Sequence, residues 1–413
     1  MTATRSRPAS TARAALAHRG FRLYWIARVL SSFGIQIVSV AVGWHIYAVT
    51  REALLLGFVG LVQFAPSLGL VLVTGTVADR VSRRGISAAC LIGEAALAVT
   101  LLVLVALDGQ MVWPIFPVLA GFGVARAFLA PAMQALVPNL VPPEDLASAI
   151  ALNSATFQIG IIVGPVTGGL LYGISAEAAF GAAVACLLVA SGCMLRIVPP
   201  PQRVSREPAT LKTIVAGFGF IWRHPLVLGS ISLDLFAVLL GGATALLPVY
   251  ARDILHVGPW GLGLLRAGIG IGAILMAIYL GIRPLRDHAG AIMFVAVGFF
   301  GLFTVVFGVS TTAWLSVVAL IVMGAADMIS VYVRETLIQL ATPDAVRGRV
   351  SAVNSMFIGA SNELGEFRAG GMAALIGAVP AVVLGGFATV AVAALWAWWF
   401  PALRRARHLD EVP

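Results

Sequence analysis

The sequence is poor in charged residues: Asp, Glu, Lys and Arg make up 11% of its 413 positions, against about 25% in an average soluble domain. It has 3 cysteines and a single lysine, Lys212. The low charge excludes a disordered chain, and so few cysteines exclude a disulfide-stapled secreted scaffold. The sequence contains no Walker A motif, zinc-spaced His and Cys set or G-x-S-x-G element. We therefore expect no enzymatic activity, no cofactor and no metal.

Apolar residues take the place of the missing charge. Hydrophobic residues make up 60% of the chain, and 44 residues are glycine. A soluble domain cannot bury so much apolar surface, whereas a membrane-spanning helix needs about 20 mostly apolar residues. Twelve such runs are present, at 21–49, 54–77, 86–107, 113–137, 147–172, 177–198, 225–250, 259–282, 289–309, 312–340, 349–376 and 379–400. Because the runs do not alternate in polarity, we predict an all-α membrane protein with twelve transmembrane helices.

The basic residues are distributed unevenly between the segments that join these runs. The net charge is +9, and most arginines lie in alternate connecting segments, beginning with the N-terminal tail. The intervening segments contain only Arg51 and Arg252. Cytoplasmic loops of membrane proteins are enriched in Lys and Arg. The pattern predicts a multi-pass inner-membrane protein with both termini in the cytoplasm, and no nucleic-acid partner is needed to explain the charge.

The chain divides into two halves with six runs each. Between them, a segment begins with Pro199-Pro200-Pro201 and continues into an amphipathic stretch at 210–223. The halves also repeat, because residues 134–169 align with residues 335–370 at a constant offset. Such parallel halves are typical of secondary transporters. We predict an N-terminal tail (1–20), a six-helix bundle (21–198), a linker with an interfacial helix (199–224), a second six-helix bundle (225–400) and a C-terminal tail (401–413).

The segment after the second run carries a distinctive loop sequence. It reads Gly75-Thr76-Val77-Ala78-Asp79-Arg80-Val81-Ser82-Arg83-Arg84. This resembles the G-x-x-x-D-R-x-G-R-R signature of the major facilitator superfamily, with Ser82 in place of the second glycine. The resemblance implies that Asp79 docks on the start of the helix at 349–376 and holds the cytoplasmic side closed, since a helix N-terminus favours anions. The alternative is a solvated positive loop.

Other segments resemble exporters of the same superfamily. Residues 160–169 look like the G-x-x-x-G-P-x-x-G-G element of its antiporters, with Pro165 after the second glycine. Residues 211–227 and 338–356 resemble the enterobactin-exporter branch, which groups siderophore exporters with multidrug exporters. The resemblance covers essentially the whole chain, and it implies export of small amphipathic molecules.

Two of the runs carry stripes of glycine. Gly160, Gly164 and Gly168 recur every four residues, as do Gly268 and Gly272 in the run at 259–282. Such stripes let helices approach closely. In the superfamily fold these two helices meet where the halves rock, so we predict that the stripes, with Pro165, form a sliding contact between the halves. Ordinary static packing of the same glycines is equally compatible with the sequence.

Charged residues inside the apolar runs are candidate functional residues, because a charge in the bilayer is costly and usually faces the protein interior. Arg126 and Asp327 occupy equivalent positions of the repeat, near the middle of their runs. The superfamily fold implies that both face a central cavity from opposite halves. We expect them to pair in the absence of substrate and expect proton binding to Asp327 to break the pair. A permanent structural salt bridge is the alternative.

Asp234 and Glu363 are further proton-coupling candidates. Asp234 lies in the run at 225–250, which lines the cavity in the superfamily fold. Glu363 and Glu366 share one face of their helix, because residues three apart are neighbours on a helix. That helix usually packs behind the cavity, so a structural polar cluster of the two acids with Arg368 is equally compatible with the sequence.

Together these features predict a monomeric exporter that works by alternating access and is driven by proton antiport. Its expected partners are a small-molecule substrate, protons and the lipid bilayer. Titratable acids in the core favour a proton gradient as the energy source, since the sequence lacks an ATPase motif. Two alternatives remain, namely an uncoupled facilitator of lysolipids or metabolites, and a non-transporting membrane sensor or scaffold with the same fold.

Overall fold

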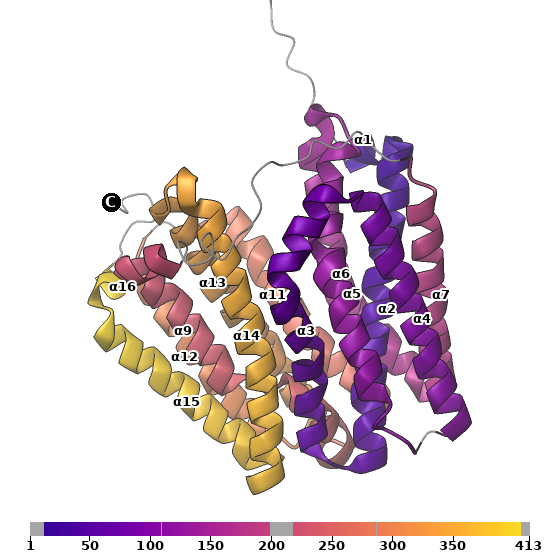
Figure 1. Cartoon of the computed structure of the whole chain (residues 1–413). Coiled ribbons are helices and arrows are strands. Elements are labelled where there is room, and N and C mark those ends of the chain that lie inside the picture. Colours follow the sequence, from indigo (N-terminus) through magenta and orange to yellow (C-terminus); the bar gives the residue numbers. More distant parts are fainter. Residues whose placement is uncertain (1–11, 109, 199–217, 286, 406–413) are drawn as a thin grey trace, which may run out of the picture.

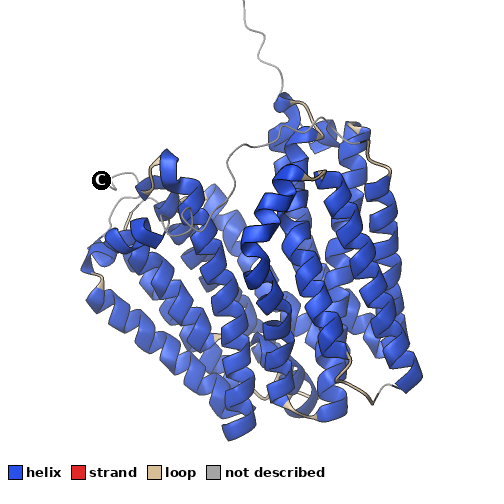
Figure 2. Ribbon diagram, in the orientation of Figure 1, coloured by secondary structure: helices blue, strands red, loops and turns tan. Residues whose placement is uncertain are grey.

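The computed structural model describes residues 12–108, 110–198, 218–285 and 287–405. Within these ranges the protein is almost entirely helical and contains no strand (Figure 2). The helices form two bundles that stand side by side, one from each half of the sequence (Figure 1). The predicted all-α fold with two matched bundles is therefore confirmed.

The N-terminal bundle is built from hairpins of long helices. The first hairpin turns at Arg51, which adopts the left-handed conformation (φ 58°) and donates its N–H to the carbonyl of Tyr47. This arrangement is a common way to end a helix. The helices are α1 (Ala12–Ala17), α2 (Arg19–Thr50), α3 (Ala53–Arg80), α4 (Arg83–Asp108), α5 (Ile115–Leu136), α6 (Leu146–Ile174) and α7 (Ala176–Leu195), with 3-10 turns at Val137–Asn139 and Pro143–Asp145.

The C-terminal bundle begins with a broken helix. We expected one helix over 225–250, but α9 ends at Gly241 and a 3-10 turn, a short helix and a π turn follow. Gly241-Gly242 weakens the helix, and Pro248 provides no backbone N–H. The elements are α9 (Pro225–Gly241), η3 (Thr244–Leu246), α10 (Leu247–Val249), η4 (Tyr250–Ile254), α11 (Gly258–Ile282), α12 (Ala289–Val309), α13 (Ala313–Ala341), α14 (Asp344–Ile376), α15 (Ala378–Trp399) and α16 (Pro401–Arg405).

All twelve predicted spans correspond to helical segments of the described chain. By length and composition, 11 of them are apolar enough to cross a membrane. The twelfth, α14, is 33 residues long but carries several charged side chains. It packs against α3, α9 and α15, so neighbouring helices cover much of a surface that would be costly in lipid.

The glycine stripes lie elsewhere than predicted. Gly160, Gly164 and Gly168 face α2, where a Cβ would meet Ser32, Gln36 and Ile37 respectively. Likewise, Gly268 and Gly272 face Leu320 and Ile321 of α13. The two stripes therefore do not contact each other in this structure, although α6 and α11 do meet, at Pro165, which was predicted with them. The stripes instead allow α2 and α6, and α11 and α13, to pack closely within each bundle.

The bundles meet mainly through two helix pairs, α6 with α11 and α3 with α14. In the first pair the carbonyl of Pro165 lies directly against Gly263, and Gly169 lies against Pro259 and Trp260. In the second pair Gly57 of α3 lies against the backbone of Phe367. These contacts lie at the end of the bundles where α2 ends and α3 begins, called here the closed end. Figure 1 shows the bundles spreading apart toward the other end, which carries α1 and α16 and is called here the arginine-rich end.

The linker prediction falls mostly on residues outside the described part of the chain. Residues 218–223 are helical, and the ring of Phe218 lies 5.3 Å from that of Phe357 on α14. The division into tails, bundles and linker stays a proposal from the sequence.

Candidate functional site

A cavity of about 420 Å³ lies between the two bundles. Its volume is in the range of pockets that bind drug-sized molecules, about 300–1,000 Å³. Residues of both bundles line it, and many are polar although they lie midway along apolar helices. The polar lining residues are Gln36, Ser39, Gln63, Arg126, Gln158, Thr244, Arg266, Asp327, Glu363 and Glu366.

Arg126 reaches into this cavity from α5 of the N-terminal bundle. Its side chain is exposed, and its guanidinium lies 3.5 Å from Oε1 of Gln63 on α3. That distance is beyond the usual range of an N–H···O hydrogen bond, about 2.7–3.2 Å. Because a guanidinium has five N–H donors, Arg126 has several donors available to a ligand.

Asp327 reaches the same cavity from α13 of the opposite bundle. Its carboxylate makes no hydrogen bond or ion pair with any residue that the structure describes. The charged groups that act on it are Asp234 and Arg334. The expected ion pair between Arg126 and Asp327 is therefore absent in this structure, because the cavity separates the two side chains.

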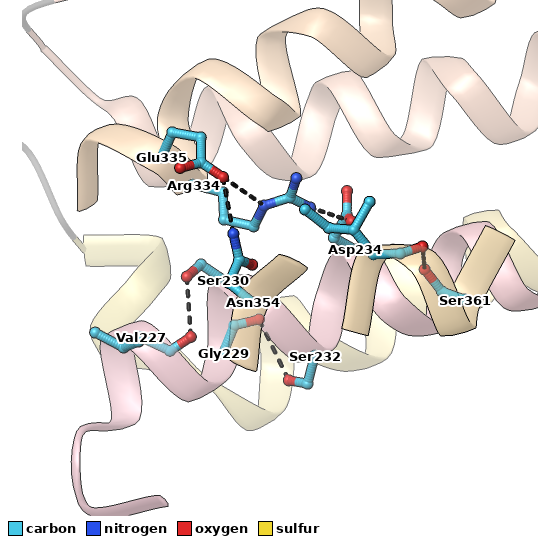
Figure 3. A network of polar contacts seen from close by, with 10 residues as sticks. Val227, Gly229, Ser230, Ser232, Asp234, Arg334, Glu335, Asn354 and Ser361 are labelled. Atoms are coloured by element: carbon cyan, nitrogen blue, oxygen red, sulfur yellow. Dashed lines mark hydrogen bonds and ion pairs between the residues drawn. The ribbon is translucent and has the colours of Figure 1, made fainter. Parts of the chain in front are cut away.

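Arg334 pairs instead with Asp234, which joins α13 to α9 inside the C-terminal bundle (Figure 3). Both side chains are buried, with 2% and 8% of their surface exposed. Glu335 lies 4.0 Å from Nε of Arg334 and accepts a 2.8 Å hydrogen bond from the amide of Asn354 on α14. Removing one partner of such a buried pair is strongly destabilising, by about 3–5 kcal/mol.

Asp234 does not line the central cavity, but it lies close to Asp327. A gap of about 10 Å³ is bordered by Asp234, Asp327 and Ser330. A space of this size is at the lower limit for holding one water molecule. Asp327 thus borders both the cavity and a buried acid–arginine pair.

Glu363 and Glu366 also border the cavity, although their helix was expected to pack behind it. A Cβ on Gly60 of α3 would overlap the carboxylate of Glu363. Oε1 of Glu366 accepts a 2.8 Å hydrogen bond from the hydroxyl of Thr244. The predicted cluster with Arg368 is not formed, because Nε of Arg368 donates to the carbonyl of Leu239 at 2.8 Å.

The predicted gate loop is shorter than expected, since α3 continues to Arg80 and α4 begins at Arg83. The side chains of Asp79 and Arg80, and the surroundings of Gly75, lie outside the described part of the structure, so the docking of Asp79 stays a prediction. Arg83 donates to the carbonyl of Ala135 at 3.0 Å, and Arg84 donates to that of Met194 at 3.3 Å. Both arginines thus cap helix ends within their own bundle, where a positive charge is favourable.

Polar contacts join the bundles at the closed end. Asp253, in the π turn after α10, accepts hydrogen bonds from the hydroxyl of Tyr47 and, at 2.6 Å, from the guanidinium of Arg51. Nη1 of Arg266 on α11 donates to the hydroxyl of Ser39 on α2 at 2.7 Å. These contacts and the helix pairs described above close one end of the cavity.

The structure adds lining residues that the sequence prediction missed. They are mainly Gln63, Gln158 and Arg266, and each lies in an otherwise apolar helix. A polar side chain within an apolar run is the signal that identifies them, because a buried polar group needs a hydrogen-bond partner or contact with water. The described residues contain no cluster of three or more His, Cys, Asp or Glu side chains placed to hold a metal ion.

Two repeated six-helix bundles around a polar cavity define the class of secondary transporters. The chain matches the family described as transmembrane secretion effector over residues 10–413, and it belongs to that family. It is 29% identical to the enterobactin exporter of Citrobacter koseri over 416 residues, which covers 96% of this chain and 95% of the relative. It is 28% identical to the enterobactin exporter of Shigella boydii serotype 4, with 95% and 94% covered.

Solved transporter structures share the fold. The bacterial homologue of the human lysosomal transporter Spinster, in an inward-facing and unoccupied conformation, superposes with a TM-score of 0.70 at 14% identity, covering 94% of this chain and 97% of the other. The nucleoside transporter NupG superposes with a TM-score of 0.73 at 13% identity, covering 92% and 99%. At these identities the likeness establishes the major facilitator fold, with the substrate left open.

Proposed function

We propose that this protein is a secondary active exporter of small amphipathic molecules, of the drug or siderophore kind, driven by proton antiport. The observation that carries the proposal is the central cavity, into which Arg126 and Asp327 project from opposite bundles. Ionisable groups at this depth are costly unless they bind a substrate or an ion. The names of the enterobactin exporters support the direction of transport.

The way the bundles meet supports alternating access. The α6–α11 and α3–α14 contacts near the closed end hold that side of the cavity shut. Rocking one bundle against the other would part these contacts and bring the arginine-rich ends together. The cavity would then open to the other side of the membrane.

The positive-inside rule assigns the arginine-rich end to the cytoplasm. Arg22, Arg83, Arg84, Arg283, Arg404 and Arg405 are at or near helix ends on that side. With this orientation, both termini lie in the cytoplasm of a bacterial-type inner membrane. The structure then corresponds to an inward-open state that is ready to take up cargo.

Asp327 is the proposed proton carrier. It faces the cavity without a hydrogen-bond partner among the described residues, and a titratable acid within a membrane span is a default candidate for a proton relay. Coupling requires substrate and proton to bind in alternation, so that proton uptake accompanies substrate release outside. The buried pair of Asp234 and Arg334 beside it keeps the charge of this region fixed.

Efflux from proteoliposomes that contain the purified protein tests the proposal. Efflux of a substrate identified in a dye panel should require an imposed proton gradient and should stop with a protonophore. Asp327→Asn should abolish gradient-driven efflux, and the exposed Glu52→Gln should leave it unchanged. Full gradient-driven efflux by Asp327→Asn would exclude Asp327 as the carrier, whereas efflux that ignores the gradient would favour an uncoupled facilitator. No flux for any panel member would favour a sensor or scaffold.

A further inference from the structure

A second cavity, of about 410 Å³, is lined by residues of the N-terminal bundle alone and is called here the arginine cavity. Its lining comes from α2, α5 and α6. Arg28 and Arg126 are its charged residues, and Gln36, Gln134 and Ser32 add further polar groups. None of its lining residues is acidic. Arg126 borders the central cavity as well, so the two spaces meet at this residue.

The guanidinium groups of this cavity have donors without acceptors. Nε of Arg28 is buried and has no hydrogen-bond partner among the described residues. Among the described residues, the hydrogen-bond contact of Arg126 is the 3.5 Å one with Gln63. An unsatisfied donor on a buried charged group is costly. Nε of Arg28, which is buried, and the exposed guanidinium of Arg126 are therefore both open to acceptor oxygens from a ligand.

One buried carboxylate, that of Glu94, is close enough to act electrostatically with these arginines. Glu94 on α4 is fully buried, and neither of its oxygens has a hydrogen-bond partner among the described residues. Arg126 and Arg28 are the charged groups that act on it. Glu94 does not line the arginine cavity. Arg126 also acts on Glu363, which lines the central cavity. The arginine cavity itself is lined by two arginines and no acid, and such a positive wall favours one anionic group.

We propose that the arginine cavity binds an anionic group of the exported molecule, so that the substrates are amphipathic organic acids. This inference rests on the proposed function and specifies its substrate class. Arg28 and Arg126 hold the oxygens of a carboxylate or a comparable anion, because guanidinium groups bind such oxygens with charge-assisted hydrogen bonds. Phe157 and neighbouring aliphatic residues of the lining contact the apolar part.

The place of this cavity agrees with loading from the cytoplasm. Gln134 and Phe157 are exposed, and Gln134 is near the end of α5 on the arginine-rich side. The acids Asp327, Glu363 and Glu366 line the central cavity and not this one. An anionic group is thus attracted to the N-terminal bundle and repelled from the acidic wall of the opposite bundle.

Direct binding to the full chain in detergent tests the inference with probes that share one fluorophore. Dansylglycine carries a negative charge, dansylamide is neutral and dansylcadaverine is positive. Dansyl fluorescence should show the tightest binding for dansylglycine. Arg28→Gln and Arg126→Gln should each weaken it by about tenfold or more, since each removes charge-assisted hydrogen bonds, with little effect on dansylcadaverine. Arg22→Gln is the matched control, because Arg22 is an exposed arginine of the same helix.

Equal affinity for the three probes, or an anion preference that persists in the Arg28→Gln/Arg126→Gln double variant, would overturn the inference. If a glutamine variant fails to fold, Arg28→Lys and Arg126→Lys keep the charge and should keep the preference for dansylglycine. Proteoliposome efflux separates this inference from the proposed function. Charge-selective binding without efflux would contradict the proposed export and leave the anion site standing. Efflux without charge selectivity would contradict the anion site and leave the proposed export standing.

Discussion

The contact of α6 with α11 at the closed end offers the sharpest test of alternating access. Gly263 of α11 lies directly against the backbone of Pro165 and Val166 of α6. Gly263→Ala places a methyl group in that contact. Because α6 and α11 part at this end when the cavity opens outward, we expect the substitution to destabilise the present state and spare the outward-open state.

The size of the effect follows from the geometry. A Cβ at position 263 would lie 2.9 Å from Cα of Val166 and 3.0 Å from the carbonyl carbon of Pro165. Non-bonded carbons pack at about 3.5–4.0 Å, and both neighbours are backbone atoms that cannot rotate away. Overpacking of this kind costs about 1–3 kcal/mol. The equilibrium between the two states should therefore shift by roughly 5- to 150-fold toward the outward-open state.

Distances between spin labels at the closed end measure this shift. Glu52→Cys and Thr311→Cys place labels at exposed positions of the two bundles near that end, in a background where the three free native cysteines are replaced by alanine. Gly263→Ala should increase the population with a long distance. Gly281→Ala is the control, because it lies on the same helix and no atom lies within 4 Å of its Cβ.

Equal distance distributions for Gly263→Ala, Gly281→Ala and the parent protein would refute this account of the closed end, provided that all three elute as folded monodisperse protein. A shift caused by both alanine substitutions would also contradict it, since only one of them lies between the bundles.

Three further predictions concern polar contacts. Asp234→Asn should lower the free energy of unfolding by about 3–5 kcal/mol, because it leaves Arg334 buried without its carboxylate; chemical denaturation of the purified protein measures the loss, and an unchanged midpoint would contradict the pairing. Tyr47→Phe removes a hydrogen bond to the charged Asp253, worth about 1.5–3 kcal/mol, and should lengthen the label distance at the closed end. Arg51→Gln should have a smaller effect of about 0–1 kcal/mol, because both partners are substantially exposed.

Much of the fold could be predicted from the sequence, because the membrane imposes local rules. A run of about 20 apolar residues must form a helix, since no water satisfies backbone groups inside the hydrocarbon. The twelve spans and the two halves were predictable for this reason. The break after α9 was missed, although Gly241-Gly242 and Pro248 were visible, because hydropathy alone does not register where backbone hydrogen bonds end.

The position of Arg126 and Asp327 midway along their helices also followed from the sequence, since it can be counted within each apolar run. The residues that pair with the buried charges could not be predicted from the sequence. Arg334, seven residues beyond Asp327 on the same helix, takes Asp234 as its partner. A linear pattern cannot state which of several buried charges meet, because that depends on how helices from distant parts of the chain are packed.

The glycine stripes also show which features the sequence determines and which depend on tertiary packing. The sequence by itself determined that something must approach Gly160, Gly164 and Gly168 closely, because a residue without a side chain leaves a smooth surface. Only the tertiary structure decided that the neighbour is α2 of the same bundle and that Gly169 and Gly263 join the bundles instead. Helix formation depends on contacts four residues apart and on the solvent around them, whereas the choice of neighbour depends on the packing of the whole molecule.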